Sequence, residues 1–93
     1  MIISFNCKRT EKVFHRLRGH RFTADIQTRA AIKLRVLHFA QNLNDLRVPP
    51  SNHLEALKGD RKGQHSIRIN KKSRICFRWT DAGAEDVEIV DYH

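Results

Sequence analysis

The spacing of apolar residues changes once along this chain, and this change constrains the fold more than any other feature. In the first half, apolar residues such as Ala30, Leu34 and Leu37 recur at helical spacing. In the last third, Ile67 and Ile69 alternate with polar residues, which is the period of a half-buried strand. A chain of 93 residues divided in this way is expected to form one α+β domain over residues 1–93, with helices packed on one face of an antiparallel sheet.

Turn and cap signals divide the two halves into a strand, two helices and three further strands. The expected elements are a strand at residues 1–5, helices at 7–18 and 23–42, and strands near 66–70, 74–79 and 87–90. Gly19 is expected to end the first helix, and Thr23 to cap the second. A loop that contains Pro49 and Pro50 cannot continue the second helix.

Composition narrows the class of partner and the compartment. The formal net charge is +8, and eight Lys and Arg residues stand against two acids between residues 53 and 79. Such a balance indicates an anionic partner: nucleic acid, a membrane surface or an acidic protein. No apolar run approaches the roughly 20 residues that a membrane span needs. Of the three classes of partner, a membrane is not expected. Cys7 and Cys76 fit no metal or redox motif and are expected to be buried or half-buried thiols in a reducing cytoplasm.

The alternation of the strands predicts where their arginines point. If Ile75 and Phe77 pack on the helices, Arg74 and Arg78 point to the opposite face of the sheet. Arg68 on the preceding strand would point the same way, so three arginines would share one open face. Five acids and no bases lie between residues 81 and 93, and they could partner some of these arginines.

The C-terminal residues Asp91, Tyr92 and His93 bring titratable groups next to this basic segment. Histidine titrates near neutral pH, so His93 can serve as acid or base. Tyr92 would need adjacent positive charge to act as a base, and Asp91 is expected to orient His93 or to pair with an arginine. Arg74 presents a planar fork suited to phosphate oxygens. Together these groups could support attack of an RNA 2′-hydroxyl on the adjacent phosphate.

Four motifs follow one another in a fixed order in the second half of the chain. They are Leu54-Glu55-Ala56-Leu57-Lys58-Gly59-Asp60-Arg61-Lys62-Gly63, Ser66-Ile67-Arg68-Ile69, Arg74-Ile75 and Asp91-Tyr92-His93. With the length and the opening Met-Ile-x-Ser-Phe, they resemble the HigB toxins of the RelE-like superfamily of bacterial type II toxin–antitoxin systems. The resemblance extends over the whole chain.

The resemblance implies a RelE-like two-layer fold, a specific activity and a partner. HigB toxins enter the ribosomal A site and cleave mRNA there, without a metal or a cofactor. In RelE-type cleavage the 2′-hydroxyl attacks the adjacent phosphate and leaves a 2′,3′-cyclic phosphate and a 5′-hydroxyl. A HigA antitoxin, which is a helix-turn-helix protein, neutralises the toxin. Operator DNA would be contacted only through this antitoxin.

The candidate site residues form a catalytic group and an RNA-contacting group. By the match to the family's motif, the candidate catalytic residues are Arg74, Asp91, Tyr92 and His93. The candidate RNA-contacting residues are His53, Lys58, Arg61, Lys62, His65, Arg68 and Arg78. No metal ligands are expected.

This chain departs from the family's pattern at three positions. The family's upstream histidine aligns with Glu55, two residues after His53. Many relatives carry aromatic residues where this chain has His65 and Ser73. Fewer aromatic rings leave less surface on which a base can stack, so base preference or rate is expected to differ.

Two other functions fit the same residues. The chain could be a non-catalytic module that binds RNA or the ribosome, or a subunit whose basic face binds an acidic antitoxin segment. Catalysis requires the C-terminal triplet, whereas binding depends mostly on the basic residues. A neighbouring reading frame for a small helix-turn-helix protein would favour the toxin.

Overall fold

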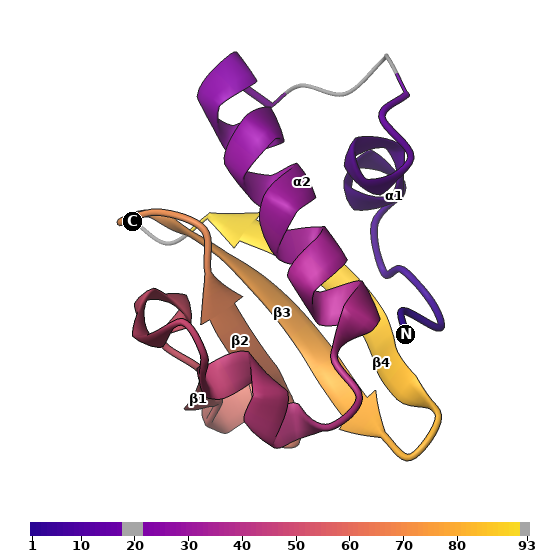
Figure 1. Ribbon diagram of the computed structural model, residues 1–93, viewed down its shortest axis with the longest axis vertical. Coiled ribbons are helices and arrows are strands. Elements are labelled where there is room, and N and C mark those ends of the chain that lie inside the picture. Colours follow the sequence, from indigo (N-terminus) through magenta and orange to yellow (C-terminus); the bar gives the residue numbers. More distant parts are fainter. Residues whose placement is uncertain (18–21, 92–93) are drawn as a thin grey trace.

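Two helices pack on a four-stranded antiparallel sheet, which confirms the expected α+β class (Figure 1). The computed structural model describes residues 1–17 and 22–91. The helices are α1 (Lys8–Phe14) and α2 (Ala24–Phe39), and the strands are β1 (Glu55–Ala56), β2 (His65–Arg68), β3 (Ser73–Thr80) and β4 (Gly83–Asp91). Three 3₁₀ helices, η1 (Leu43–Arg47), η2 (Pro50–Asn52) and η3 (Gly59–Arg61), lie in the connections.

The helix α1 is shorter than the sequence predicts. It ends at Phe14 rather than at residue 18, because Arg16 adopts a left-handed backbone conformation with φ of 57° that a helix cannot contain. The expected stop at Gly19 lies outside the described residues. Cys7 is the N-cap residue and is half-buried, and Cys76 is fully buried, as expected.

The helix α2 begins where the sequence predicts and ends earlier. The Thr23 hydroxyl accepts a hydrogen bond of 3.3 Å from the Ile26 amide, which confirms the cap. The helix ends at Phe39 rather than near residue 42, because Asn42 and Asp45 form a reciprocal capping box that starts η1. No helix within residues 1–17 and 22–91 is long and apolar enough to cross a membrane.

The sheet has the order β1-β2-β3-β4, and every neighbouring pair is antiparallel. The meander of the last three strands confirms the prediction, whereas the two-residue strand β1 was not expected. The expected N-terminal strand forms only two isolated parallel bridges to β4, Ile2 with Ala84 and Phe5 with Val87. The N-terminal segment therefore lies along the β4 edge of the sheet (Figure 1).

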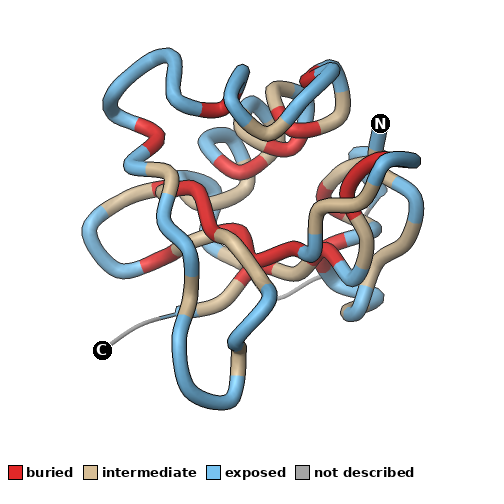
Figure 2. The backbone as a smooth tube through the Cα atoms, turned by 90° about the horizontal axis from the view of Figure 1, so that it is seen from below, coloured by how far each residue is buried: buried red, intermediate tan, exposed pale blue. Residues whose placement is uncertain are grey.

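The hydrophobic core lies between the helices and one face of the sheet. Leu34 and Leu37 of α2 are fully buried, and so are Ile67, Ile75 and Phe77 of the strands. Figure 2 shows the buried residues on the helices and the central strands, with exposed residues along the connections. The predicted inward face of β3 is thus confirmed, although Trp79 is only half-buried.

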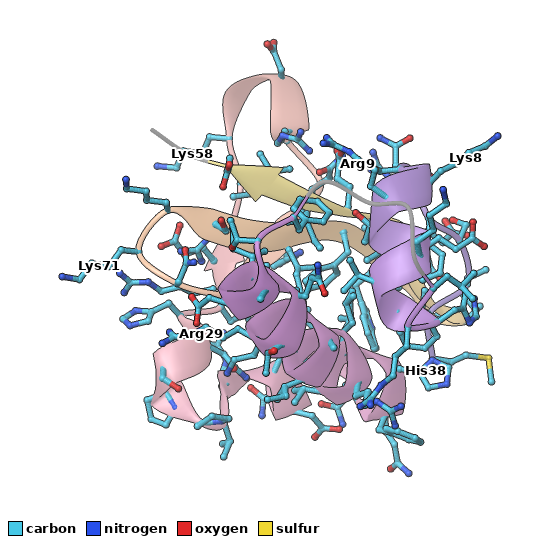
Figure 3. The ribbon with its side chains drawn as sticks, turned by 90° about the horizontal axis from the view of Figure 1, so that it is seen from above. Lys8, Arg9, Arg29, His38, Lys58 and Lys71 are labelled. Atoms are coloured by element: carbon cyan, nitrogen blue, oxygen red, sulfur yellow. The ribbon has the colours of Figure 1, made fainter. Side chains whose placement is uncertain are left out.

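The opposite face of the sheet is not the open surface that the alternation predicts. Ser66 and Cys76, which lie on this face, are fully buried. The segment that contains η3 lies on this side of the sheet, opposite α2 (Figure 3). Arg61 at the end of η3 forms an ion pair of 2.9 Å with Glu88 of β4, which holds the segment against the sheet.

Candidate functional site

Arg74, at the start of β3, has a cationic side chain that two hydrogen bonds hold in place. Its Nε donates a hydrogen bond of 2.7 Å to the Ser66 hydroxyl, and its Nη2 donates one of 2.6 Å to the backbone carbonyl of His53. Only 16% of the side chain is exposed. These two bonds fix both the position and the plane of the guanidinium, which suits a role in binding a planar or tetrahedral anion.

Glu55 lies beside the same guanidinium. Its Oε1 is 3.7 Å from Nη1 of Arg74, and 58% of the Glu55 side chain is exposed. The pairing of Glu55 with Ser66 between β1 and β2 brings this carboxylate to the site, since Ser66 also contacts Arg74. The Glu55 carboxylate therefore lies at one edge of the Arg74 guanidinium, which is the group that would contact a phosphate.

Asp91, the last residue of β4, is held by Ser73. The Ser73 hydroxyl donates a hydrogen bond of 2.6 Å to Oδ1 of Asp91, and the two residues are register partners between β3 and β4. Asp91 itself is exposed. Because Ser73 directly precedes Arg74, the end of β4 lies beside the start of β3, where Arg74 is fixed.

Arg68 and His53 complete the group around Arg74. Arg68 is the register partner of Arg74 across β2 and β3. The Nε of Arg68 donates a hydrogen bond of 3.1 Å to the Asn70 carbonyl. His53 is exposed and has a left-handed backbone with φ of 45°, and this conformation accompanies the contact of its carbonyl with Arg74. The structure thus brings Arg68, Arg74, His53 and Asp91 to the same end of the sheet.

The predicted basic turn divides into exposed and paired residues. Lys58 and Lys62 flank η3 and are exposed. Arg61 between them is half-buried, and its Nη1 donates to Glu88 at 2.9 Å and to Gln64 at 3.1 Å. Arg61 therefore has a structural role in holding η3, whereas the two lysines are available to a polyanion.

Arg78 and His65 lie apart from the group around Arg74. Arg78 follows a β-bulge after Cys76, and its Nε is 3.9 Å from Oδ2 of Asp86, so an acid of β4 does partner one of the strand arginines. The His65 ring stacks on Phe77 with centroids 6.3 Å apart, on the helix-covered face of the sheet. The structure does not bring His65 together with Arg74.

The sequence of this chain is similar to those of known proteins over most of its length. The model of the family described as the RelE-like toxin of the type II toxin–antitoxin system HigB matches residues 3–93. Toxin HigB-1 of Vibrio cholerae serotype O1 is 39% identical over 85 residues, which cover 90% of each chain. The chain belongs to the HigB-like toxin family. An uncharacterized protein of Haemophilus influenzae is 43% identical to this chain over 49 residues, which cover 53% of this chain and 48% of that protein.

Family membership establishes the general role of this HigB-like toxin. It is a toxin of the type II toxin–antitoxin class with a RelE-like fold, and the class implies an antitoxin partner. Two of the four candidate catalytic residues, Tyr92 and His93, lie outside the described residues, and they follow Asp91 directly in the chain. Among the residues that the structure does describe, no group of three His, Cys, Asp or Glu side chains could hold a metal ion.

Three contacts of the toxin's site were not predicted from the sequence. Ser66, Ser73 and Glu55 contact Arg74 or Asp91, although the sequence analysis placed none of them in the site. The alternation of β2 offered a signal for Ser66, which shares a face with Arg68. The family alignment did mark the positions of Glu55 and Ser73 as departures, but their contacts with Arg74 and Asp91 depend on strand register.

Proposed function

We propose that this HigB-like toxin is an endoribonuclease that cleaves mRNA in the A site of the ribosome and so inhibits translation. In the proposed reaction, the 2′-hydroxyl oxygen attacks the adjacent phosphorus, and the bond from phosphorus to the 5′-oxygen breaks. A base removes the 2′-hydroxyl proton, and an acid donates a proton to the leaving 5′-oxygen. The products are a 2′,3′-cyclic phosphate and a 5′-hydroxyl.

The observation that carries this proposal is the fixed guanidinium of Arg74 beside the end of β4. Its hydrogen bonds to Ser66 and His53 use only some of its N–H groups, which leaves others to contact a phosphate oxygen. A donor that is already oriented stabilises the charge of the pentacovalent transition state without further reorganisation. Arg74 is accordingly assigned this charge-stabilising role.

The proton transfers are assigned to the C-terminal residues. Tyr92 and His93 supply the base and the acid in this proposal, and Asp91, held by Ser73, orients the end of the chain. Each general acid–base step contributes about 10² to 10⁴-fold to the rate, so much of the acceleration must come from positioning of the RNA. The ribosome would supply that positioning, and the free toxin would be a poor nuclease.

The partners in this proposal are those expected for a type II toxin. A HigA-type helix-turn-helix antitoxin would neutralise the toxin in the cytoplasm, and operator DNA would be bound through that antitoxin. Lys58 and Lys62, which flank η3, would contact RNA phosphates without reading sequence. Their exposure supports this role, since neither is buried against the sheet.

Single-turnover cleavage of an mRNA on programmed ribosomes tests the proposal. Purified toxin should cut ribosome-bound mRNA and leave the same mRNA intact when ribosomes are omitted. A matched mRNA with one 2′-O-methyl nucleotide on the 5′ side of the cut should resist cleavage at that position, because the attacking hydroxyl is blocked. Ribosome binding without any cut would favour the non-catalytic RNA-binding alternative, and cleavage of the methylated mRNA would exclude the 2′-hydroxyl mechanism.

A further inference from the structure

A cavity of about 400 Å³ is lined in part by His53, the residue whose carbonyl accepts a hydrogen bond from Arg74. Its walls come from α2, from the residues around η2, and from β2 with the turn that follows it. The strand β1 pairs only with His65 and Ser66, so it does not continue along the rest of β2, where Arg68 lines the cavity. Its volume is within the range of small-ligand sites in proteins.

The polar wall of this cavity is strongly basic. It contains Arg29 and Lys33 of α2, Arg68 of β2 and Lys71 of the β2–β3 turn, and no described residue that lines it is acidic. Figure 3 shows Arg29 and Lys71 on the same side of the molecule, although they lie far apart in the sequence. The Nε of Arg29 is paired with Oδ1 of Asp25 at 3.1 Å, so Arg29 offers the cavity only its remaining N–H groups. Four cationic side chains from three elements still favour an anionic ligand.

Lys33 has a fixed position in this wall. Its Nζ donates to Oδ1 of Asn52, which is fully buried and donates through Nδ2 to the carbonyls of Leu46 and Val48. Partial burial lowers the pKa of Lys33, so the entry of an anion would stabilise its charged form. Lys33 is thus oriented before any ligand arrives.

The cavity also has an apolar wall. Ile32 and Ile69 line it, and 57% of Ile32 is exposed even though it lies among charged side chains. An apolar surface beside several cations suits a ligand that joins a phosphate to a flat or sugar-like group. Inorganic phosphate alone would leave this surface exposed to water.

We propose that the cavity binds one nucleotide of an RNA strand, with its phosphate on Arg29, Lys33, Arg68 and Lys71 and its ribose or base against Ile32. This inference rests on the proposed function, because it assigns the RNA a second contact outside the reacting centre. His53 connects the cavity to the proposed reacting centre. It lines the cavity, and its backbone carbonyl accepts the hydrogen bond from Arg74. A strand that reaches Arg74 from the β2 edge would therefore place a neighbouring nucleotide in the cavity.

Adenosine 5′-monophosphate is the probe for a direct binding test. In NMR titrations of the full chain at constant ionic strength, it should shift the amide signals of residues 29–33 and 68–71. Adenosine and inorganic phosphate, used separately, should each bind more weakly. The double variant R29Q/K71Q should bind the mononucleotide roughly tenfold more weakly, because charge-assisted hydrogen bonds to phosphate are lost.

The control variant R35Q/K8Q removes the same two charges elsewhere. Arg35 also lies on α2 but lines other hollows, and Lys8 lies on the far side of the molecule from the cavity (Figure 3). This variant should bind the mononucleotide as the unaltered chain does. Equal weakening of both variants, or amide shifts that miss the cavity, would overturn the proposal. The amide spectrum of each variant also reports whether it is folded.

The nucleotide can come from messenger or ribosomal RNA, and two further assays distinguish these sources. If it is messenger RNA, R29Q/K71Q should weaken binding of a short single-stranded RNA and spare co-sedimentation with empty ribosomes. If it is ribosomal RNA, the reverse should hold. Both outcomes support the site, whereas no difference from R35Q/K8Q in either assay would contradict it. Failure of the unaltered chain to cleave mRNA on ribosomes would refute the proposed function without changing the mononucleotide result.

Discussion

The Ser73 hydroxyl donates a hydrogen bond of 2.6 Å to Oδ1 of Asp91, and this contact joins the start of β3 to the last described residue of β4. Ser73 itself is fully buried, so the acceptor is held by a group that cannot move freely. In the proposed function, this bond sets the direction in which the C-terminal residues leave the sheet.

Replacing Ser73 by Ala is expected to lower both stability and cleavage. The loss of the hydrogen bond to a carboxylate should reduce the free energy of unfolding by about 1 kcal/mol. Single-turnover cleavage on ribosomes should fall more than this small destabilisation explains, since Asp91 loses its orienting contact. T80A is the control, because it removes a hydroxyl that donates to the Gly83 carbonyl at the other end of β3. Equal cleavage by the two variants would make the Ser73 contact purely structural.

Arg74→Ala should reduce cleavage far more than it weakens ribosome binding. The expected loss of the single-turnover rate is about 10² to 10³-fold, which is typical when a preorganised donor to a transition state is removed. Arg74→Lys should restore only part of the rate, because an ammonium group cannot reproduce the two directed bonds to Ser66 and His53. Cleavage and ribosome co-sedimentation measured on the same samples separate the two effects. Parallel losses would make Arg74 a docking residue.

Glu55→Gln is expected to strengthen RNA binding. The carboxylate lies 3.7 Å from Nη1 of Arg74 and competes with a phosphate for that edge of the guanidinium. Because Glu55 is more than half exposed, the effect should be modest, roughly threefold in the affinity for a short RNA. Fluorescence anisotropy with labelled RNA measures this affinity. The matched control is E11Q, which removes the same charge from α1, an element that does not contribute to the group around Arg74. Weaker RNA binding by E55Q would show that the carboxylate supports the site instead of competing within it.

The residues of the basic turn should separate into docking and structural roles. The double variant K58Q/K62Q should be as stable as the unaltered chain. Its ribosome association should depend less on salt: the slope of log K against log salt concentration should fall by about 0.7 for each lost contact to single-stranded RNA. R61A should instead reduce the free energy of unfolding by about 1 kcal/mol, because it removes the partner of Glu88. Ribosome co-sedimentation across a salt series and chemical denaturation check the two parts. A K58Q/K62Q variant that lost single-turnover cleavage with an unchanged salt slope would place these lysines in the reacting centre.

Periodicity predicted the layers of the fold because the burial of one face imposes it. The helical spacing of Leu34 and Leu37 and the alternation of Ile75 and Phe77 both correspond to full burial in the core. The strand β1 was missed, because its two residues are too few to show a period. The early end of α2 was missed because it depends on a local hydrogen-bond exchange between Asn42 and Asp45.

The candidate site was predictable in its residue types and not in its contacts. The motif match selected Arg74 and Asp91 as candidates, but the groups that contact them, Ser66 and Ser73, are selected by strand register. The expected open face of arginines was wrong, because the segment with η3 lies on this side of the sheet and Arg61 pairs there with Glu88. Cys76 on the same face is fully buried. The pairing of Arg61 with Glu88 joins residues 27 positions apart, and no spacing in the sequence indicates such a contact.

The most direct test of the central claim is primer extension on a reporter mRNA after this chain is induced alone in cells. The full chain should arrest growth and produce new 5′ ends within translated codons, each carrying a 5′-hydroxyl. A chain that lacks Tyr92 and His93 should be expressed and folded, because terminal residues contribute little to a core, and it should produce neither effect. Growth arrest without new mRNA ends, or equal cleavage by the shortened chain at equal expression, would contradict the account.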